Sequence, residues 1–235
     1  MSRKQKFLIA VKSTLSLLLA WALLQLMEGA LLEAGARLSG FNGQVVWHAF
    51  VFRVPVQQGD LKQIFFLSLF PWLVFVLWLI LFPVRFNPAK NKHEFFRLLK
   101  AWIFLLVLVR VLWMPAWETV YRTGIYPAFH RFRFFGCGPY LTAIVLFLGF
   151  LMVVFRISAL FAGSLPVPAG RFLKSGDIRP HLLYLWAVPF VVLLLLLVGV
   201  SGLKPGFFNG YFAGGIAFAL LVNTPYISSY KVIVR

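Results

Sequence analysis

The sequence contains few charged residues, and very few of these are acidic. Charged side chains make up 12% of its 235 residues, and six residues in total are Asp or Glu. Soluble domains carry about 25% charged residues, so this chain lacks the charge to cover a water-facing surface. The shortage excludes an ordinary soluble domain, a disordered chain and a nucleic-acid-binding domain of the usual kind. We therefore expect no nucleic-acid partner.

Cysteine and the common catalytic motifs are also scarce. Cys137 is the single cysteine, which excludes an internal disulfide, a CxxC redox pair and a thiolate zinc cage. The sequence has no Walker A, GxSxG or GxGxxG motif, and the segment that starts at His93 like an HExxH motif ends in Arg97. We predict no catalytic residue and no cofactor. A metal site built from His48, His130 and Cys137 is a minor alternative, because no two of the histidines share a metal-ligand spacing.

The sequence is instead rich in apolar residues, which form 61% of the chain and raise its mean hydropathy to +0.88. About 20 apolar residues in a helix cross the ~30 Å hydrocarbon core of a bilayer. Six stretches approach this length, and the last is short and interrupted by glycines. Gly210 and Gly214 in that stretch have the spacing that allows close helix packing. We predict an all-α polytopic membrane protein with one domain over 1–235 and helices over about 7–32, 61–83, 95–117, 139–161, 181–203 and 206–222.

The basic residues are concentrated in alternate connections between these helices. With a cytoplasmic N-terminus, 15 of the 23 Lys and Arg residues fall on the cytoplasmic side. Lys and Arg accumulate in the cytoplasmic loops of membrane proteins. The pattern therefore predicts a protein of a bacterial-type inner membrane with both termini in the cytoplasm. The same charges predict contact with membrane lipids, including anionic lipid at the cytoplasmic face, at about 1 kcal/mol per basic residue near the surface.

Two segments on the predicted outer side have an unusual composition for loops. β-branched and aromatic residues run over 45–56, and Pro55 argues against a helix there, so we predict a short strand or hairpin in the outer interface. Over 118–138, aromatic residues are interleaved with arginines. This composition suits the headgroup layer. The candidate lipid- or substrate-binding residues of this segment are Arg122, Arg131 and Arg133.

Arg110 is the most unusual single residue, because it lies inside an apolar helix. A rise of about 1.5 Å per residue from Lys100 places it ~15 Å deep, near the middle of a bilayer. A charge at that depth costs at least about 2.5–3.5 kcal/mol, so Arg110 should face the protein interior and have a partner. Gln25 and Glu28 are the candidate partners. Two interpretations stay open, an interhelical clamp or a site for an anionic lipid or substrate group.

Glu33 completes the candidate polar residues near the outer end of the first helix. It precedes Arg37 by four residues, the favourable order for an ion pair on a helix surface. Glu28 and Glu33 are five residues apart, so their side chains diverge by roughly 140°. This divergence disfavours a pair of cooperating carboxylates and favours a solvated helix end with one ion pair.

The order of these elements resembles the intramembrane metalloproteases of the site-2 type. The first helix runs through Leu32-Glu-Ala-Gly-Ala36, the predicted strand follows, and the next helix opens at Leu69-Phe-Pro71. In that family the first helix carries HExxH and a membrane-associated β segment follows it. Here Leu32 and Ala36 occupy the positions of the two histidines. The resemblance therefore implies a non-catalytic relative of that family.

Three functions are compatible with the sequence. The first is a non-catalytic subunit or scaffold of a membrane protein assembly with protein partners in the membrane. The second is a small transporter or lipid-handling protein with a polar cavity around Arg110 and Glu28. The third is an intramembrane enzyme that would use Glu28, Glu33, His48 and His130 on a lipid-linked substrate, or the inactive metalloprotease relative described above.

Overall fold

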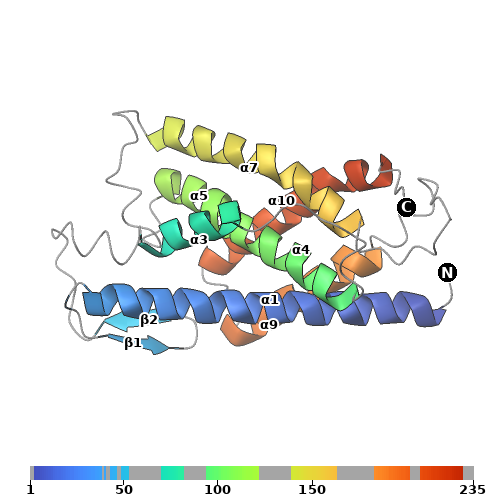
Figure 1. Ribbon diagram of the computed structural model, residues 1–235, viewed down its shortest axis with the longest axis horizontal. Coiled ribbons are helices and arrows are strands. Elements are labelled where there is room, and N and C mark those ends of the chain that lie inside the picture. Colours follow the sequence, from blue (N-terminus) through green and yellow to red (C-terminus); the bar gives the residue numbers. More distant parts are fainter. Residues whose placement is uncertain are drawn as a thin grey trace.

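The computed structural model describes residues 3–38, 40, 43–46, 49–52, 70–81, 94–121, 139–162, 183–201 and 207–229. Within these residues the chain forms six helical segments and one hairpin, and the six segments agree with the predicted number of helices. α1 and α10 run in opposite directions, so the start of α1 and the end of α10 lie at the same end of the molecule (Figure 1). The helical segments are α1 (Arg3–Leu38), α3 (Phe70–Leu81), α4–η2–α5 (Glu94–Leu108, Val109–Trp113 and Met114–Tyr121), α7 (Pro139–Ala162), η4–α9 (Leu183–Ala187 and Val188–Ser201) and α10 (Phe207–Ser229).

α1 is a single long helix that buries one face. That face packs against α4, η4 and α9. The helix ends shortly before Gly40, whose φ of 84° lets its N–H donate to the Arg37 carbonyl at 3.1 Å. The buried side chains recur every three or four residues, as one face of a helix requires: Ile9, Ser13, Leu17, Ala20 and Leu24.

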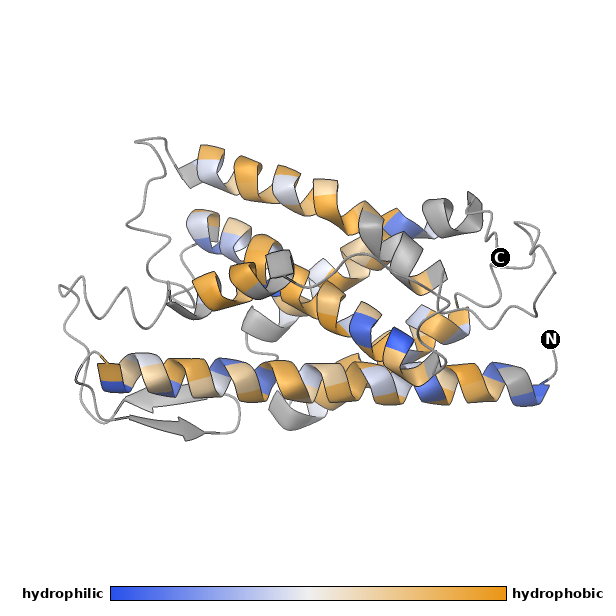
Figure 2. Cartoon of the chain, viewed as in Figure 1, coloured by the Kyte–Doolittle hydropathy of each residue, from blue (hydrophilic) through white to orange (hydrophobic). Residues whose placement is uncertain are grey.

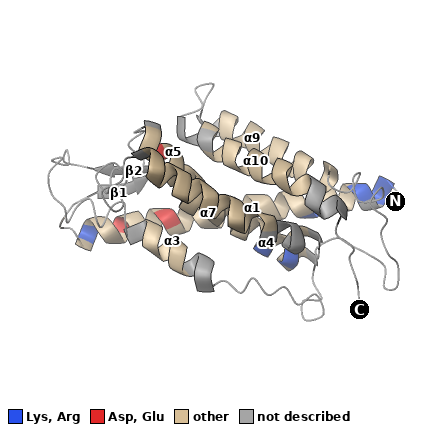
Figure 3. Ribbon diagram, turned by 90° about the horizontal axis from the view of Figure 1, so that it is seen from above, with Lys and Arg blue, Asp and Glu red and all other residues tan. Residues whose placement is uncertain are grey.

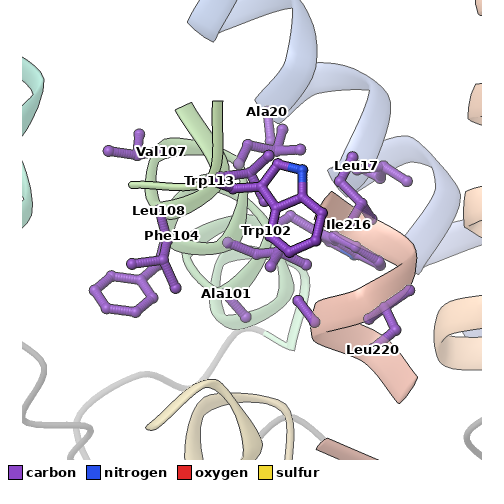
Figure 4. Packing of buried hydrophobic residues seen from close by; sticks show 14 of the residues in the cluster. Leu17, Ala20, Ala101, Trp102, Phe104, Val107, Leu108, Trp113, Ile216 and Leu220 are labelled. Carbon is purple, nitrogen blue, oxygen red and sulfur yellow. The ribbon is translucent and has the colours of Figure 1, made fainter. Parts of the chain in front are cut away.

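The continuous helix α4–η2–α5 forms the core of the fold. From Ala101 to Ala116 every residue is buried except Ile103 and Leu112, which are half-buried. This helix contacts α1, α7 and α10. Figure 4 shows Trp102 of this helix in a cluster of buried hydrophobic residues. The cluster includes Leu17 and Ala20 of α1 and Ile216 and Leu220 of α10. The core is therefore one helix enclosed by others, and Arg110 lies within its most buried stretch.

A two-stranded antiparallel hairpin follows α1. β1 (Gly43–Val46) pairs with β2 (Ala49–Phe52), with Gly43 opposite Phe52 and Val46 opposite Ala49. Both strands contact α1 (Figure 1). The hairpin overlaps the segment 45–56 that the sequence predicts to be extended, and the last four residues of that segment lie outside the described residues. An outer interfacial position for the hairpin stays a prediction.

The helix bounds agree with the predicted ones to different degrees: α1 runs to Leu38, six residues beyond the predicted end, and α3 is described from Phe70, nine residues after the predicted start. α7 matches the predicted 139–161 to within one residue. The glycines predicted a short, interrupted helix over 206–222, but α10 is continuous to Ser229. A glycine costs a helix only about 1 kcal/mol relative to alanine, which packing against neighbouring helices outweighs.

The glycine that packs closely is also different from the expected pair. A Cβ atom added at Gly210 or Gly214 would meet nothing within 4 Å, so the prediction of close packing at this pair is wrong. A Cβ at Gly215 would lie 2.6 Å from Cδ1 of Trp113 and 2.8 Å from Cγ1 of Val109. Gly215 therefore allows α10 to approach η2 closely.

Large apolar side chains also cover much of the outside of the molecule. Tyr140, Val145 and Met152 of α7 and Leu195 of α9 are each at least 60% exposed. Figure 2 shows hydrophobic residues along much of α7. Among the described residues, the helix Lys6–Leu38 is long and apolar enough to cross a membrane. The other apolar helical stretches among the described residues are shorter: Tyr140–Phe155, Leu183–Gly199 and Phe212–Thr224.

Candidate functional site

Arg110 and Glu28 form an ion pair inside the helix bundle. Nη2 of Arg110 lies 2.5 Å from Oε2 of Glu28, and the two side chains are 1% and 14% exposed. The guanidinium carbon of Arg110 also lies 5.0 Å from the centre of the Phe212 ring of α10. An arginine over an aromatic face gains a cation–π attraction that strengthens when water is excluded. Arg110 thereby connects three helices, α1, η2 and α10.

The sequence positions both partners through simple helical spacing. Glu28 follows the buried Leu24 by four residues, so it continues the buried face of α1 toward the core. Gln25, the other candidate partner, lies three residues before Glu28 and is half-buried. The structure therefore selects Glu28 from the two partners that the sequence proposed for Arg110.

Arg110 lies in a π-helical turn that precedes a proline. In η2 the N–H of Met114 bonds the carbonyl of Val109, five residues back. Pro115 has no N–H, so it leaves the Val111 carbonyl without its usual helical donor. The indole Nε1 of Trp72, from α3, donates to that carbonyl at 2.8 Å. A side chain of a neighbouring helix thus replaces the hydrogen bond that the proline removes.

The same arrangement recurs at the second π-helical turn. η4 (Leu183–Ala187) ends two residues before Pro189, as η2 ends two residues before Pro115. Pro189 leaves the Leu185 carbonyl without a helical donor, and Oγ of Ser13 in α1 donates to it at 2.6 Å. Ser13 in turn accepts a hydrogen bond of 3.0 Å from Nε1 of Trp102. This buried chain of hydrogen bonds connects α4, α1 and η4.

Trp113, the last residue of η2, is the centre of an aromatic cluster. Its ring lies 5.2 Å from Phe218 of α10 and 5.4 Å from Phe150 of α7, measured between ring centres. Trp117 and Phe147 complete the cluster at 5.8 and 5.9 Å. Aromatic pairs at these separations contribute about 0.5–1.5 kcal/mol each beyond the area they bury. The cluster fixes the turn that carries Arg110 against α7 and α10.

Glu33 and Glu118 differ in their burial. Glu33 forms an ion pair with Arg37 on α1, with side chains 38% and 77% exposed, as the spacing predicted. Glu118 of α5 is buried at 1% exposure. The remaining candidates lie outside the described residues: His48, Arg122, His130, Arg131, Arg133 and Cys137.

Sequence reasoning found the charged pair but missed the hydrogen bonds that support it. The cost of burying Arg110 is the signal for its partner, whereas Pro115 and Pro189 lie in apolar runs that hold no comparable signal. A proline inside a membrane-like helix predicts a foreign donor for the carbonyl four residues back. Ser13 and Trp72 are such donors.

The arrangement has the contacts that a clamp between α1, η2 and α10 requires. Arg110 and Glu28 neutralise one another in a largely water-free setting, and the turn around them is fixed by Trp72 and by the aromatic cluster. Among the described residues, no group of three or more His, Cys, Asp or Glu side chains could bind a metal ion. Leu32 and Ala36, which stand at the metalloprotease histidine positions, lie within α1, and the hairpin follows α1 as that resemblance implies.

No protein family model, no curated protein and no solved structure matches this chain.

Proposed function

We propose that the chain is a polytopic inner-membrane protein with six spanning helices and cytoplasmic termini. In this proposal it serves as a non-catalytic subunit or scaffold of a membrane protein assembly. The observation that carries the proposal is the Arg110–Glu28 pair, because it commits a buried arginine and its carboxylate partner to joining helices. A residue that is neutralised by its partner is not poised as a free acid, base or nucleophile.

The proline sites support the membrane part of the proposal. Prolines inside membrane helices are tolerated when neighbouring helices, hydroxyl side chains and π-helical turns satisfy the freed backbone groups. All three devices occur here, at Pro115 with Trp72 and at Pro189 with Ser13. The exposed apolar residues of α1, α7 and α9 would face lipid or a partner helix, where burial from water favours them.

Purification at native abundance tests the subunit role. The full chain carries a C-terminal affinity tag in its own host and is extracted in a mild detergent. A defined partner, present in a constant ratio to the chain after size-exclusion chromatography, supports the proposal. A chain that elutes alone as a single species overturns the subunit role. The untagged strain is the control for proteins that bind the resin.

A small transporter or lipid-handling protein is the second candidate. It is favoured by the exposure of Glu28, whose side chain is 14% exposed while Arg110 beside it is 1% exposed. A carboxylate at the edge of the buried pair could exchange places with an anionic substrate group. Arg110→Met would then abolish transport or lipid binding in a protein that still folds. A loss of stability alone, with binding retained, supports the clamp.

A further inference from the structure

The end of the molecule at which α1 and α4 begin carries a group of basic side chains. We infer that this basic cluster, defined by Lys12, Arg97 and Lys100, binds the headgroups of anionic phospholipids. The inference rests on the proposed membrane insertion. It adds the class of ligand that this part of the surface would bind. Figure 3 shows Lys and Arg residues at the beginnings of both helices, whereas the Asp and Glu residues lie toward the opposite end.

Two hydrogen bonds place the three cluster residues at the same level of the molecule. Oγ of Ser16 in α1 lies 3.4 Å from the carbonyl of Phe95 in α4, and Trp102 donates to Ser13. Lys12 is next to Ser13 in the chain, and Arg97 and Lys100 lie between Phe95 and Trp102. The two helices therefore cross at the level of these basic residues, although 85 residues of sequence separate Lys12 from Arg97.

The length of α1 places this level at the edge of the hydrocarbon. Its 36 residues span about 54 Å at 1.5 Å per residue, which exceeds a core of ~30 Å. Residues 13–32 contain no Lys or Arg and span about 30 Å by the same rise. A bilayer centred on residues 13–32 puts Lys12 at the boundary, with the preceding turns of α1 in the headgroup layer.

The surroundings of the cluster favour a lipid over an acidic protein. Phe7 of α1 and Phe96 of α4 are 72% and 56% exposed beside the basic residues. An aromatic ring next to a cationic side chain suits the interface between hydrocarbon and headgroups, whereas an acidic soluble partner would leave these rings in water. Segments 3–12 and 94–100 together hold six basic residues and a single acidic one, Glu94.

The opposite end of α1 offers no comparable attraction among the described side chains. There Glu33 pairs with Arg37, so the two charges cancel. At the basic end, Nζ of Lys6 lies 5.8 Å from the centre of the Tyr184 ring and ties the start of α1 to η4. The basic cluster is thus the part of the described surface with both a net positive charge and exposed aromatic rings.

Lipid exchange with the purified protein tests the inference. Delipidated full-length protein is incubated with vesicles of pure phosphatidylcholine or with vesicles that also contain phosphatidylglycerol, and retained lipid is counted by native mass spectrometry. The triple variant Lys12→Gln, Arg97→Gln, Lys100→Gln is compared with Arg171→Gln, Lys174→Gln, Arg179→Gln, which loses the same charge from another connection on the same predicted side. We expect the first variant to bind phosphatidylglycerol at least tenfold more weakly, since each basic residue near an anionic surface contributes roughly a fivefold factor. We expect the second to weaken binding much less than the first does, because its three residues lie outside the cluster.

Four outcomes would overturn the inference. Equal weakening in both triple variants means that bulk charge acts rather than this cluster. Displacement of the lipid by millimolar inorganic phosphate at constant ionic strength assigns the cluster to a free anion. Unchanged binding in the first variant removes the cluster outright. The charge-preserving variant Lys12→Arg, Arg97→Lys, Lys100→Arg should retain binding, and its loss would also count against a headgroup site. An alkaline carbonate wash of native membranes separates the two proposals: release of the chain contradicts membrane insertion, whereas retention with failed lipid binding contradicts only this inference.

Discussion

Arg110 pairs with Glu28 where water can reach little of either side chain, and this burial determines the cost of breaking the pair. Removal of one partner leaves the other charge uncompensated, at a typical cost of about 3–5 kcal/mol. We expect Glu28→Leu to lower the free energy of unfolding in detergent by about 3 kcal/mol, the low end of that range, because Glu28 retains some contact with solvent. The double variant Glu28→Leu, Arg110→Met should recover most of the loss, since apolar residues can replace a buried pair at little net cost. Denaturant titration of the unaltered protein, the two single variants Glu28→Leu and Arg110→Met, and the double variant measures the coupling free energy between the two side chains.

The exposed pair on the same helix provides the control for that cycle. Arg37→Met should change the free energy of unfolding by no more than about 0.5 kcal/mol, because an exposed ion pair contributes little. A loss at Arg37 as large as that at Glu28 would mean that any charge change in α1 destabilises the chain. The clamp interpretation would then fail.

Gly215 is the second residue whose identity the packing dictates. A methyl group there would overlap the Trp113 indole at 2.6 Å, and the indole is held on its other sides by aromatic rings. We expect Gly215→Ala to destabilise the protein by about 1–3 kcal/mol through overpacking. Gly214→Ala, one residue earlier and in open space, should be neutral or stabilising by up to about 1 kcal/mol, the helix preference for alanine. The unfolding temperatures of the two variants in the same detergent measure this difference. Equal effects would contradict the close approach of Gly215 to Trp113.

At the scale of a helix, the π-helical turns are explained by the prolines that follow them. The Val111 carbonyl accepts a hydrogen bond from Trp72 because Pro115 cannot supply one. Trp72→Phe should therefore cost about 1–3 kcal/mol, the penalty for a buried acceptor left without a donor. In a Pro115→Ala background, the backbone N–H gained at position 115 restores the helical donor, so the same Trp72→Phe change should cost markedly less. A double-mutant cycle on the unfolding free energy measures this difference, and additive effects would show that Trp72 acts by packing alone.

The sequence predicts the helices much better than it predicts the bonds between them. Long apolar runs suffice to place α1, α7 and the central helix, since a run of 20 residues leaves little choice of element. The cost of a buried charge also suffices to pair Arg110 with the first helix. The contact between Ser13 and the Leu185 carbonyl spans 172 residues of sequence, and no local pattern announces it. The sequence does not reveal the role of Gly215 for a similar reason. Gly210, Gly214 and Gly215 lie in the same helix, and only the contact with Trp113 of another helix distinguishes Gly215 from the other two.

For the whole molecule, the arrangement of charge is the property that the described structure and the sequence share. Basic residues lie at the end where α1 and α4 begin, and the described acidic residues lie mainly toward the other end (Figure 3). The proposed cytoplasmic termini would place this basic end on the cytoplasmic side. The segment with Arg122, Arg131 and Arg133 is the exception, because the orientation rule expects few basic residues on the outer side. Its side of the membrane therefore tests the whole topology.

The single cysteine of the chain lies in that segment and reports its side directly. Cys137 precedes α7 and is predicted to be outside. A membrane-impermeant maleimide should label it in intact spheroplasts, and Cys137→Ser should abolish the labelling. In the Cys137→Ser background, Ser175→Cys in the connection before η4 should react only after the membrane is permeabilised. The reverse pattern, with Cys137 protected and residue 175 labelled in intact cells, would show that the three arginines orient the protein and that both termini face outward. Labelling of both positions in intact cells would contradict α7 as a membrane-spanning helix, because the two sites flank it with no other predicted span between them.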